Sequence, residues 1–154
     1  MRIKKILKFG GSSIANPERI REVASIILSA AKKERIVVVV SAFQGVTNQL
    51  LECARLAEIG DSKFQSLYKA LVKRHTTTLN VLHKNHPPKQ IKAQLQAMLA
   101  ELHDVLQGIY LLRHGSPRAL DLTASFGERL SGLTIASFLQ QSYPSCFVDS
   151  RELV

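Results

Sequence analysis

The sequence predicts an α/β protein in which a mainly parallel sheet lies between helices in three layers, and three observations favour this class. A strand pattern at 3–9 is followed by a helix pattern and by a second strand pattern at 36–40. This order is typical of a βαβ unit with two parallel strands and a right-handed crossover. Polar, glycine-containing loops follow both strand patterns. Helical periodicity at about 61–113 then predicts an inserted helical hairpin.

The first βαβ unit has clear local signals. Residues 3–9 read as a strand in which Ile6 and Leu7 are apolar and Phe9 is the last residue, and Asn-Pro-Glu at 16–18 is typical of a helix start. Asn can cap the free amides, Pro fits the first helical position and Glu opposes the helix dipole. Apolar side chains over 20–31 then fall on one face of an amphipathic helix. The unbroken β-branched run at 36–40 predicts a strand that is covered on both faces.

Helical patterns dominate the remainder. A helix is expected from about residue 50, and two long helices are expected within 61–108, separated by His-Pro-Pro at 86–88. Ser-Pro at 116–117 predicts the start of a further helix that runs to about residue 141. Residues 145–149 read as a third strand. Three strands are few for so many helices, so we expect the chain to be part of a longer protein.

The net charge of +9 could indicate a nucleic-acid partner. Most of the excess lies between Asp61 and His114, where eight Lys and Arg residues face three acidic residues. This segment lacks interleaved aromatic residues, so we interpret it as the solvated faces of helices and expect no nucleic-acid partner. Apolar runs also stay well short of the ~20 residues that span a bilayer, and we expect no membrane association.

The cysteines and the amino terminus indicate a cytoplasmic protein. Lys8 and the glycine pair at 10–11 interrupt any apolar region that could serve as a signal peptide. Cys53 and Cys146 are far apart in sequence and have no spacing typical of a metal site. We therefore expect two buried, reduced thiols rather than a disulfide.

Polar clusters follow the predicted strands, and binding sites in parallel sheets form at the carboxyl ends of strands. The clusters comprise Lys8, Gly10, Gly11, Ser12 and Ser13; Ser41, Thr47 and Asn48; and Asp149. Glycines let a phosphate approach the backbone, successive amides can bind an anion, and a lysine adds positive charge. Walker and dinucleotide-binding patterns are absent. The residues alone leave an anion site and a tight turn with an exposed lysine both open.

Glu128 is a second candidate, in the motif SFGERLS at 125–131. Small and apolar residues surround it on the predicted helix, so its carboxylate could point into a cavity and hold a substrate ammonium group. The alternative is a solvent-facing glutamate that pairs with Arg129, since most helical glutamates are exposed. Both interpretations remain open from the residues alone.

Two further patterns do not support a site. His83 and His86 share a helical face, but no cysteine or carboxylate completes a metal-binding set, so we expect a solvated helix end and no metal site. Ser41 lacks the glycine-flanked turn of a nucleophilic serine, and no histidine lies near it in sequence.

Four segments together resemble the aspartokinases, which have the amino-acid kinase (carbamate kinase-like) fold. They are KFGGSS at 8–13, VVVVSAFQGVTN at 37–48, SFGERLS at 125–131 and FVDSREL at 147–153. They occur in the family's order and span nearly the whole chain. The resemblance implies transfer of the γ-phosphoryl group of MgATP to the side-chain carboxylate of L-aspartate. The product is 4-phospho-L-aspartate, on the route to lysine, threonine and methionine.

The resemblance also implies roles for individual residues. Lys8 would stabilise the transferring phosphoryl group, and the phosphate would be bound by Gly10, Gly11 and Ser12. The aspartate pocket would be lined by Ser41, Ala42 and Thr47, with Glu128 on the α-ammonium group. ATP and Mg²⁺ are the implied cofactors of the parent enzyme, with no metal ligands among these residues, and the parent is expected to be a homo-oligomer.

The chain departs from the family in two ways. Phe43 and Gln44 stand where the family often has small residues. Residues 1–154 also cover only the amino-terminal, aspartate-binding lobe, so we expect the nucleotide-binding half to be absent and the isolated chain to be nearly inactive. Possible alternatives are a non-catalytic module that binds aspartate or a partner, a nucleic-acid-binding protein, and another amino-acid kinase. SFGERLS argues against the last.

Overall fold

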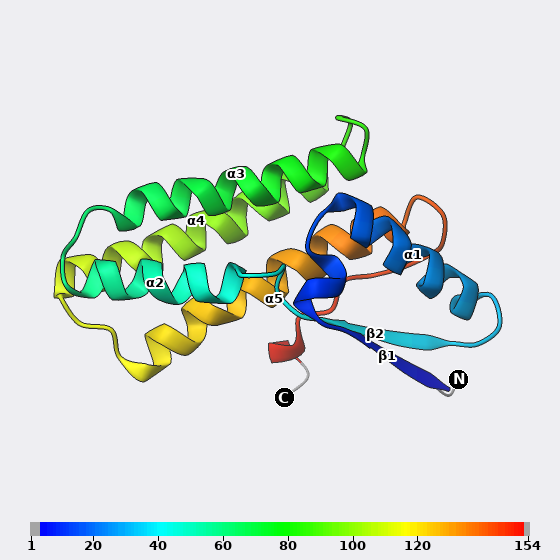
Figure 1. The fold of residues 1–154 in the computed structure, drawn as a ribbon, viewed down its shortest axis with the longest axis horizontal. Helices are drawn as coiled ribbons and strands as arrows, with labels where there is room; N and C mark the ends of the chain where they lie inside the picture. The colour runs from blue at the N-terminus through cyan, green and yellow to red at the C-terminus, as the bar shows by residue number, and fades with distance from the viewer. Residues whose placement is uncertain (1–3, 153–154) are drawn as a thin grey trace.

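The computed structural model describes residues 4–152, which form an elongated molecule with a helical bundle at one end and a small sheet at the other (Figure 1). Helices α2, α3, α4 and α5 pack together in the bundle, and α1 lies beside the sheet. The elements are β1 (Lys5–Phe9), η1 (Gly11–Ile14), α1 (Pro17–Ala31), β2 (Ile36–Val40), α2 (Val46–Glu58), α3 (Phe64–Leu82), α4 (Lys89–Leu112), α5 (Pro117–Leu139) and η2 (Ser150–Glu152).

The predicted βαβ unit is confirmed. Strands β1 and β2 are parallel, with Lys5 opposite Ile36 and Phe9 opposite Val40. Helix α1 begins where the sequence predicts, because the side chain of Asn16 accepts a hydrogen bond of 2.9 Å from the backbone amide of Arg19. The predicted start of the first strand at residue 3 lies outside the described residues.

The prediction that 36–40 is covered on both faces is wrong for the described part of the chain. Leu7 and Val38 face the core under α1 and α5, whereas alternate side chains point the other way. On that open face Ile6 is 68% exposed and Val39 is 44% exposed. The β-branched run therefore forms a strand with one buried face, and alternate apolar side chains along it remain in contact with solvent.

The helical hairpin at about 61–113 is confirmed as α3 and α4, which are joined by the predicted proline-containing turn. Lys84 and Asn85 adopt left-handed backbone angles there, with φ of 51° and 67°. The next helix also begins as predicted, since the hydroxyl oxygen of Ser116 accepts a hydrogen bond of 3.2 Å from the amide of Ala119. Apolar side chains of α2, α3, α4 and α5 form one continuous core with those of α1.

The predicted third strand at 145–149 is wrong. This segment is not hydrogen-bonded into the sheet, which within residues 4–152 has two strands. Side-chain contacts hold it instead. The Gln140 side chain donates a 2.7 Å hydrogen bond to the carbonyl of Ser145, and the Phe147 ring packs so tightly on Gly132 that a Cβ there would lie 2.8 Å from it. An apolar sequence pattern cannot distinguish this anchoring from a backbone ladder.

Two smaller predictions need correction. Both cysteines are free, but only Cys53 is buried and Cys146 is exposed. Burial raises the pKa of the Cys53 thiol to about 11, so this thiol is protonated at neutral pH. His83 is buried rather than solvated. Its Nε2 lies 3.0 Å from the hydroxyl oxygen of Ser137, and its Nδ1 lies 3.2 Å from the side-chain amide nitrogen of Gln141. It ties the end of α3 to the end of α5.

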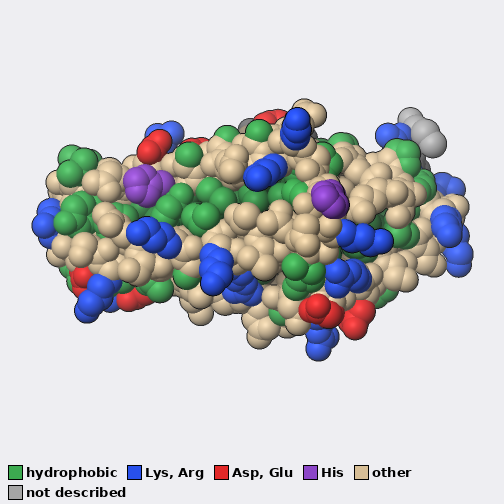
Figure 2. Space-filling model, turned by 90° about the horizontal axis from the view of Figure 1, so that it is seen from above, with side chains coloured by type: hydrophobic (Ala, Val, Ile, Leu, Met, Phe, Trp, Pro, Cys, Tyr) green, Lys and Arg blue, Asp and Glu red, His purple; other side chains and the backbone are tan. Residues whose placement is uncertain are grey.

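Most basic residues of the 61–114 segment are exposed to solvent, as predicted, whereas Arg74 is partly buried and donates a 3.2 Å hydrogen bond to the carbonyl of Ala15. Six lysines there are exposed: Lys63, Lys69, Lys73, Lys84, Lys89 and Lys92. The face in Figure 2 shows Lys and Arg side chains dispersed among apolar and polar groups rather than gathered in one patch. Across residues 4–152, none of the helices is both long and apolar enough to cross a membrane.

Neighbouring valines on opposite faces of β2 provide a test of the open sheet face. We expect Val39→Thr to lower the fluorescence of a dye that binds exposed apolar surface, with a change in the free energy of unfolding below about 0.5 kcal/mol. Val38→Thr places a hydroxyl against the core, so it should cost about 1–3 kcal/mol. Urea titrations at low protein concentration measure the free energy of unfolding of both variants. Equal destabilisation by the two variants would mean that the open face is covered in solution.

Candidate functional site

The loops that follow β1 and β2 lie side by side at the carboxyl ends of the strands, where the sheet meets the helical bundle (Figure 1). The ladder extends one residue past β2, because the amide of Ser41 donates a 3.0 Å hydrogen bond to the carbonyl of Phe9. After β1 the chain turns at once, with the amide of Ser13 bonded to the carbonyl of Gly10 at 3.0 Å. The two predicted polar clusters are therefore neighbours in space.

Two glycines make close contact with Ala42, the second residue of the loop at 41–45. A Cβ at Gly11 would lie 2.8 Å from the carbonyl oxygen of Ala42, and a Cβ at Gly127 would lie 2.6 Å from its Cβ. No side chain fits at such distances, so glycine is required at both positions. Because Gly11 follows β1 and Gly127 belongs to α5, three elements meet at Ala42.

Glu128 lies at the same junction. Its Oε1 accepts a hydrogen bond from the amide of Ala42 at 3.4 Å, which is long for such a bond, and its side chain is exposed. One turn along α5, the buried hydroxyl of Ser131 donates a 2.7 Å hydrogen bond to the carbonyl of Ser41. Helix α5 thus holds the loop at two successive residues while the Glu128 carboxylate stays open to solvent.

The alternative pairing of Glu128 with Arg129 is not found. Arg129 points into the protein, where Nε donates to Asp149 at 3.1 Å and Nη2 donates to Glu101 at 2.9 Å. Asp149 is therefore an ion-pair partner rather than an open polar group at a strand end. Hydrogen bonds from Arg151, together with the charges of both arginines, hold the pKa of Asp149 below its usual value.

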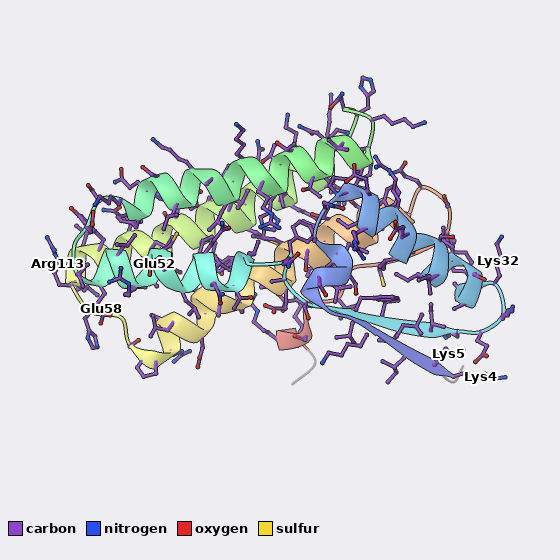
Figure 3. All side chains as sticks on the ribbon, viewed as in Figure 1. Lys4, Lys5, Lys32, Glu52, Glu58 and Arg113 are labelled. Carbon is purple, nitrogen blue, oxygen red and sulfur yellow. The ribbon has the colours of Figure 1, made fainter. Side chains whose placement is uncertain are left out.

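Lys8 lies on the open face of the sheet, opposite Val39 in the strand register. Its side chain is exposed, and within residues 4–152 it makes no ion pair. Figure 3 shows Lys4, Lys5 and Lys32 at the far end of the molecule from the loops, where the strands begin. Lys8 is thus separated from these cations and lies one residue before the end of β1.

Thr47 lies in the first turn of α2, where it is partly buried. The helix starts at Gly45, whose φ of 79° is a left-handed conformation that favours glycine. The amide of Val46 then donates a 2.9 Å hydrogen bond to the carbonyl of Phe43. This tight turn carries the chain from the loop into α2 and places Thr47 next to it. Gly10 and Ser12 are exposed in the first loop.

The chain matches the amino acid kinase family over residues 4–154. It belongs to this family. Over 148 residues it is 29% identical to the bifunctional aspartokinase/homoserine dehydrogenase 2, chloroplastic, of Arabidopsis thaliana, which covers 96% of this chain. The chain spans 16% of the length of that relative.

Two solved structures of E. coli aspartokinase III confirm the amino-acid kinase fold. The first, a complex with lysine and aspartate in the T-state, has a TM-score of 0.76 and 27% identity over 89% of this chain. The second, a complex with aspartate and ADP in the R-state, has a TM-score of 0.74 and 28% identity over 89% of this chain. In each comparison the chain spans 29% of the aspartokinase III chain.

One contact of the loop at 41–45 comes from a residue that the sequence did not identify as part of the site. His75 of α3 is fully buried, and its ring stacks on the ring of Phe43 with centroids 4.9 Å apart and planes inclined by 17°. Neither ring nitrogen has a hydrogen-bond partner within the described structure. Burial, with a smaller effect of the Arg74 charge, lowers the pKa of His75 to about 4. A histidine among polar residues on α3 gives no sequence signal of this contact.

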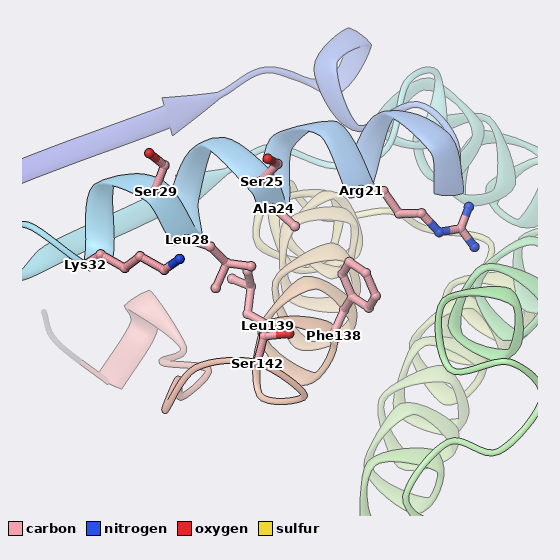
Figure 4. A pocket seen from close by; sticks show the side chains of 9 residues that line it. All are labelled: Arg21, Ala24, Ser25, Leu28, Ser29, Lys32, Phe138, Leu139 and Ser142. Carbon is pink, nitrogen blue, oxygen red and sulfur yellow. The ribbon is translucent and has the colours of Figure 1, made fainter.

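A groove of about 390 Å³ lies elsewhere, between α1 and the end of α5 (Figure 4). Its apolar side chains include Leu28, Phe138 and Leu139, and Lys32 extends along one side. None of the predicted site residues lines it. Within residues 4–152 there is also no group of three or more His, Cys, Asp or Glu side chains arranged to hold a metal ion.

Alanine substitutions at two helical glycines test the close approach at Ala42. Gly127→Ala should destabilise the protein by about 1–3 kcal/mol, because its methyl group would overlap Ala42. Gly108→Ala in α4 is the control, since a Cβ there meets nothing within 4 Å. It should stabilise by about 0.5–1 kcal/mol through helix propensity alone. Chemical denaturation measures both, and a neutral Gly127→Ala variant would contradict the close approach.

The buried histidine predicts a pH dependence of stability. The pKa of His75 is about 4 in the folded protein and near 6.5 when exposed. Between these values the unfolded state binds more protons, so stability is fully present above pH 6.5 and falls as pH drops toward 4. From pH 7 to pH 4.5 the loss should be roughly 2–3 kcal/mol.

Urea titrations at the two pH values measure this loss, with His75→Phe as the control. All other side chains are the same in the two proteins, so the difference between the proteins isolates His75. Identical pH dependence in the two proteins would show that the ring is hydrated or paired in the folded state.

Proposed function

We propose that this chain forms the aspartate-binding part of an aspartate kinase, which transfers the γ-phosphoryl group of MgATP to the side-chain carboxylate of L-aspartate. The observation that carries the proposal is the convergence on Ala42 of the two strand-end loops and Glu128. Two structural relatives with the same fold are described as complexes with aspartate, and one of them also contains ADP.

The aspartate pocket is assigned to the second loop and α5. Glu128 is exposed, and within residues 4–152 the one protein hydrogen bond that its carboxylate accepts is the long one from the amide of Ala42. Its carboxylate keeps free acceptor sites for the α-ammonium group of the substrate. Backbone and hydroxyl groups of Ser41, Ala42 and Thr47 then face the substrate carboxylates.

The phosphate side of the site is assigned to the first loop. Gly10 and Gly11 leave the backbone unobstructed, Ser12 adds a hydroxyl donor, and Lys8 supplies positive charge near the strand end. The nucleophile needs no general base, because an aspartate carboxylate is ionised at neutral pH. Catalysis then depends on positioning the reactants and on neutralising phosphate charge.

Mg²⁺ enters this scheme with ATP, as part of the substrate. The described residues offer no cluster that would hold the ion by itself, so no step is assigned to a protein-bound metal. When bound, MgATP supplies a phosphoryl group whose charge the ion partly neutralises.

The complete reaction is proposed for the whole protein. The chain spans 29% of the aspartokinase III chain and 16% of a bifunctional plant relative. For residues 1–154 alone we expect aspartate binding with little or no ATP turnover. A role in the first step toward lysine, threonine and methionine, a homo-oligomeric parent and a cytoplasmic location belong to the same proposal, although the plant relative is a chloroplastic protein.

Calorimetric titration with L-aspartate tests the site. Glu128→Gln should weaken binding by about 10–100-fold, because one charge-assisted hydrogen bond is lost. Glu22→Gln on the exposed face of α1 removes the same charge away from the loops and should leave affinity unchanged. Equal affinity for the wild type and Glu128→Gln would remove Glu128 from the site. If the wild type does not bind aspartate, this chain is not a self-sufficient aspartate site.

A further inference from the structure

His75 is a buried titratable residue that the proposed chemistry does not use. Its side chain is fully buried, and both ring nitrogens lack hydrogen-bond partners in the described structure. Leaving such groups unpaired is unfavourable, and buried polar groups are usually bonded. The contact that the His75 ring makes with the loop after β2 is the stack on Phe43.

Phe43 connects this stack to the site. It follows Ala42 directly and is 2% exposed, whereas the next two residues, Gln44 and Gly45, are exposed. Its carbonyl accepts the hydrogen bond that begins α2. The loop is thus attached to the protein interior through the Phe43 ring, immediately beside the residue that meets Glu128.

The other contacts of the loop at 41–45 are made with α5 and with the turn after β1. Ser131 of α5 holds the carbonyl of Ser41, and Gly11 and Gly127 limit the approach of Ala42. These contacts fix the loop toward β1 and α5. The stack of Phe43 on His75 adds a contact between the loop and a third element, α3, which belongs to the inserted hairpin.

We propose that His75 is a positioning residue, which stacks on Phe43 and thereby sets the position of the 41–45 loop against Glu128 and Gly11. The inserted hairpin then serves the substrate site as the support of its aspartate-binding loop. The inference rests on the proposed function for the ligand, but the position of the loop can be measured without any ligand.

The test compares two replacements of His75. His75→Phe keeps a flat ring that can stack, and His75→Leu keeps a similar volume without a ring. Leu82→Ala, on the same helix and equally buried, is the control for lost stability alone. Amide hydrogen exchange of residues 42–46, relative to amides in α4 and α5, reports the position of the loop. Calorimetry with L-aspartate reports the consequence for binding.

His75→Leu should raise exchange in the 42–46 segment by about 3–10-fold relative to the reference helices and weaken aspartate binding by a similar factor, the range expected for one lost aromatic contact. His75→Phe should keep both within about twofold. Leu82→Ala should lower stability without selective exchange in the loop. Phe43→Leu, the change from the loop side, should reproduce the His75→Leu effect, and the double variant should add little.

Unchanged loop exchange in His75→Leu would overturn the inference, as would equal loosening in His75→Leu and His75→Phe. If His75→Leu does not fold, amide exchange of residues 42–46 is compared between Phe43→Leu and the wild type, and unchanged exchange would overturn the inference. If the wild type binds no aspartate, the proposed function fails for this chain, and the exchange data still decide whether His75 positions the loop.

Discussion

The close packing of Ala42 between Gly11 and Gly127 is the constraint on which the geometry of the site depends. It brings the end of β2 against the turn after β1 and against the middle of α5, at distances that allow no side chain on either glycine. The hydrogen bonds from Ser131 to Ser41 and from Ala42 to Glu128 form only because these backbones lie so close. Among the groups assigned to aspartate, Ser41, Ala42 and Glu128 belong to this junction, and Thr47 follows in the first turn of α2.

Local signals in the sequence were sufficient for most of the fold. Asn16 and Ser116 marked helix starts through side-chain caps, which depend on neighbouring residues. The prediction of a third strand is wrong because a strand needs a partner strand, which a local pattern cannot reveal. The apolar pattern at 145–149 instead reflects the packing of Phe147 against Gly132. The open face of β2 was missed for a related reason: a run of valines does not reveal which face is covered.

The candidate site, like the fold, contains some features that are visible in the sequence and others that are not. The motifs identified the backbone groups and Glu128, because glycines and an isolated carboxylate are visible in sequence. The supporting contacts were not visible, since they join residues far apart in the chain. His75 lies 32 positions from Phe43, as the residue numbers show, and stacks without any hydrogen bond. Arg129 reaches Glu101 and Asp149 on two other segments. Such pairs follow from the packed fold and have no local pattern.

Two adjacent residues on α5 have different environments: one charge is paired within the protein and the other is open to solvent. One helical position turns the side-chain direction by about 100°, so Glu128 and Arg129 face different surroundings. Arg129 is nearly buried, lies over the Phe126 ring and is paired with two carboxylates. Its charge is neutralised within the protein and it binds the terminal segment to α4 and α5. Glu128 consequently has no arginine partner on its own helix, and its negative charge remains available at the loop junction. A carboxylate left unpaired beside two polar loops at strand ends is suited to a ligand that carries both an ammonium group and an anionic group, as an amino acid does.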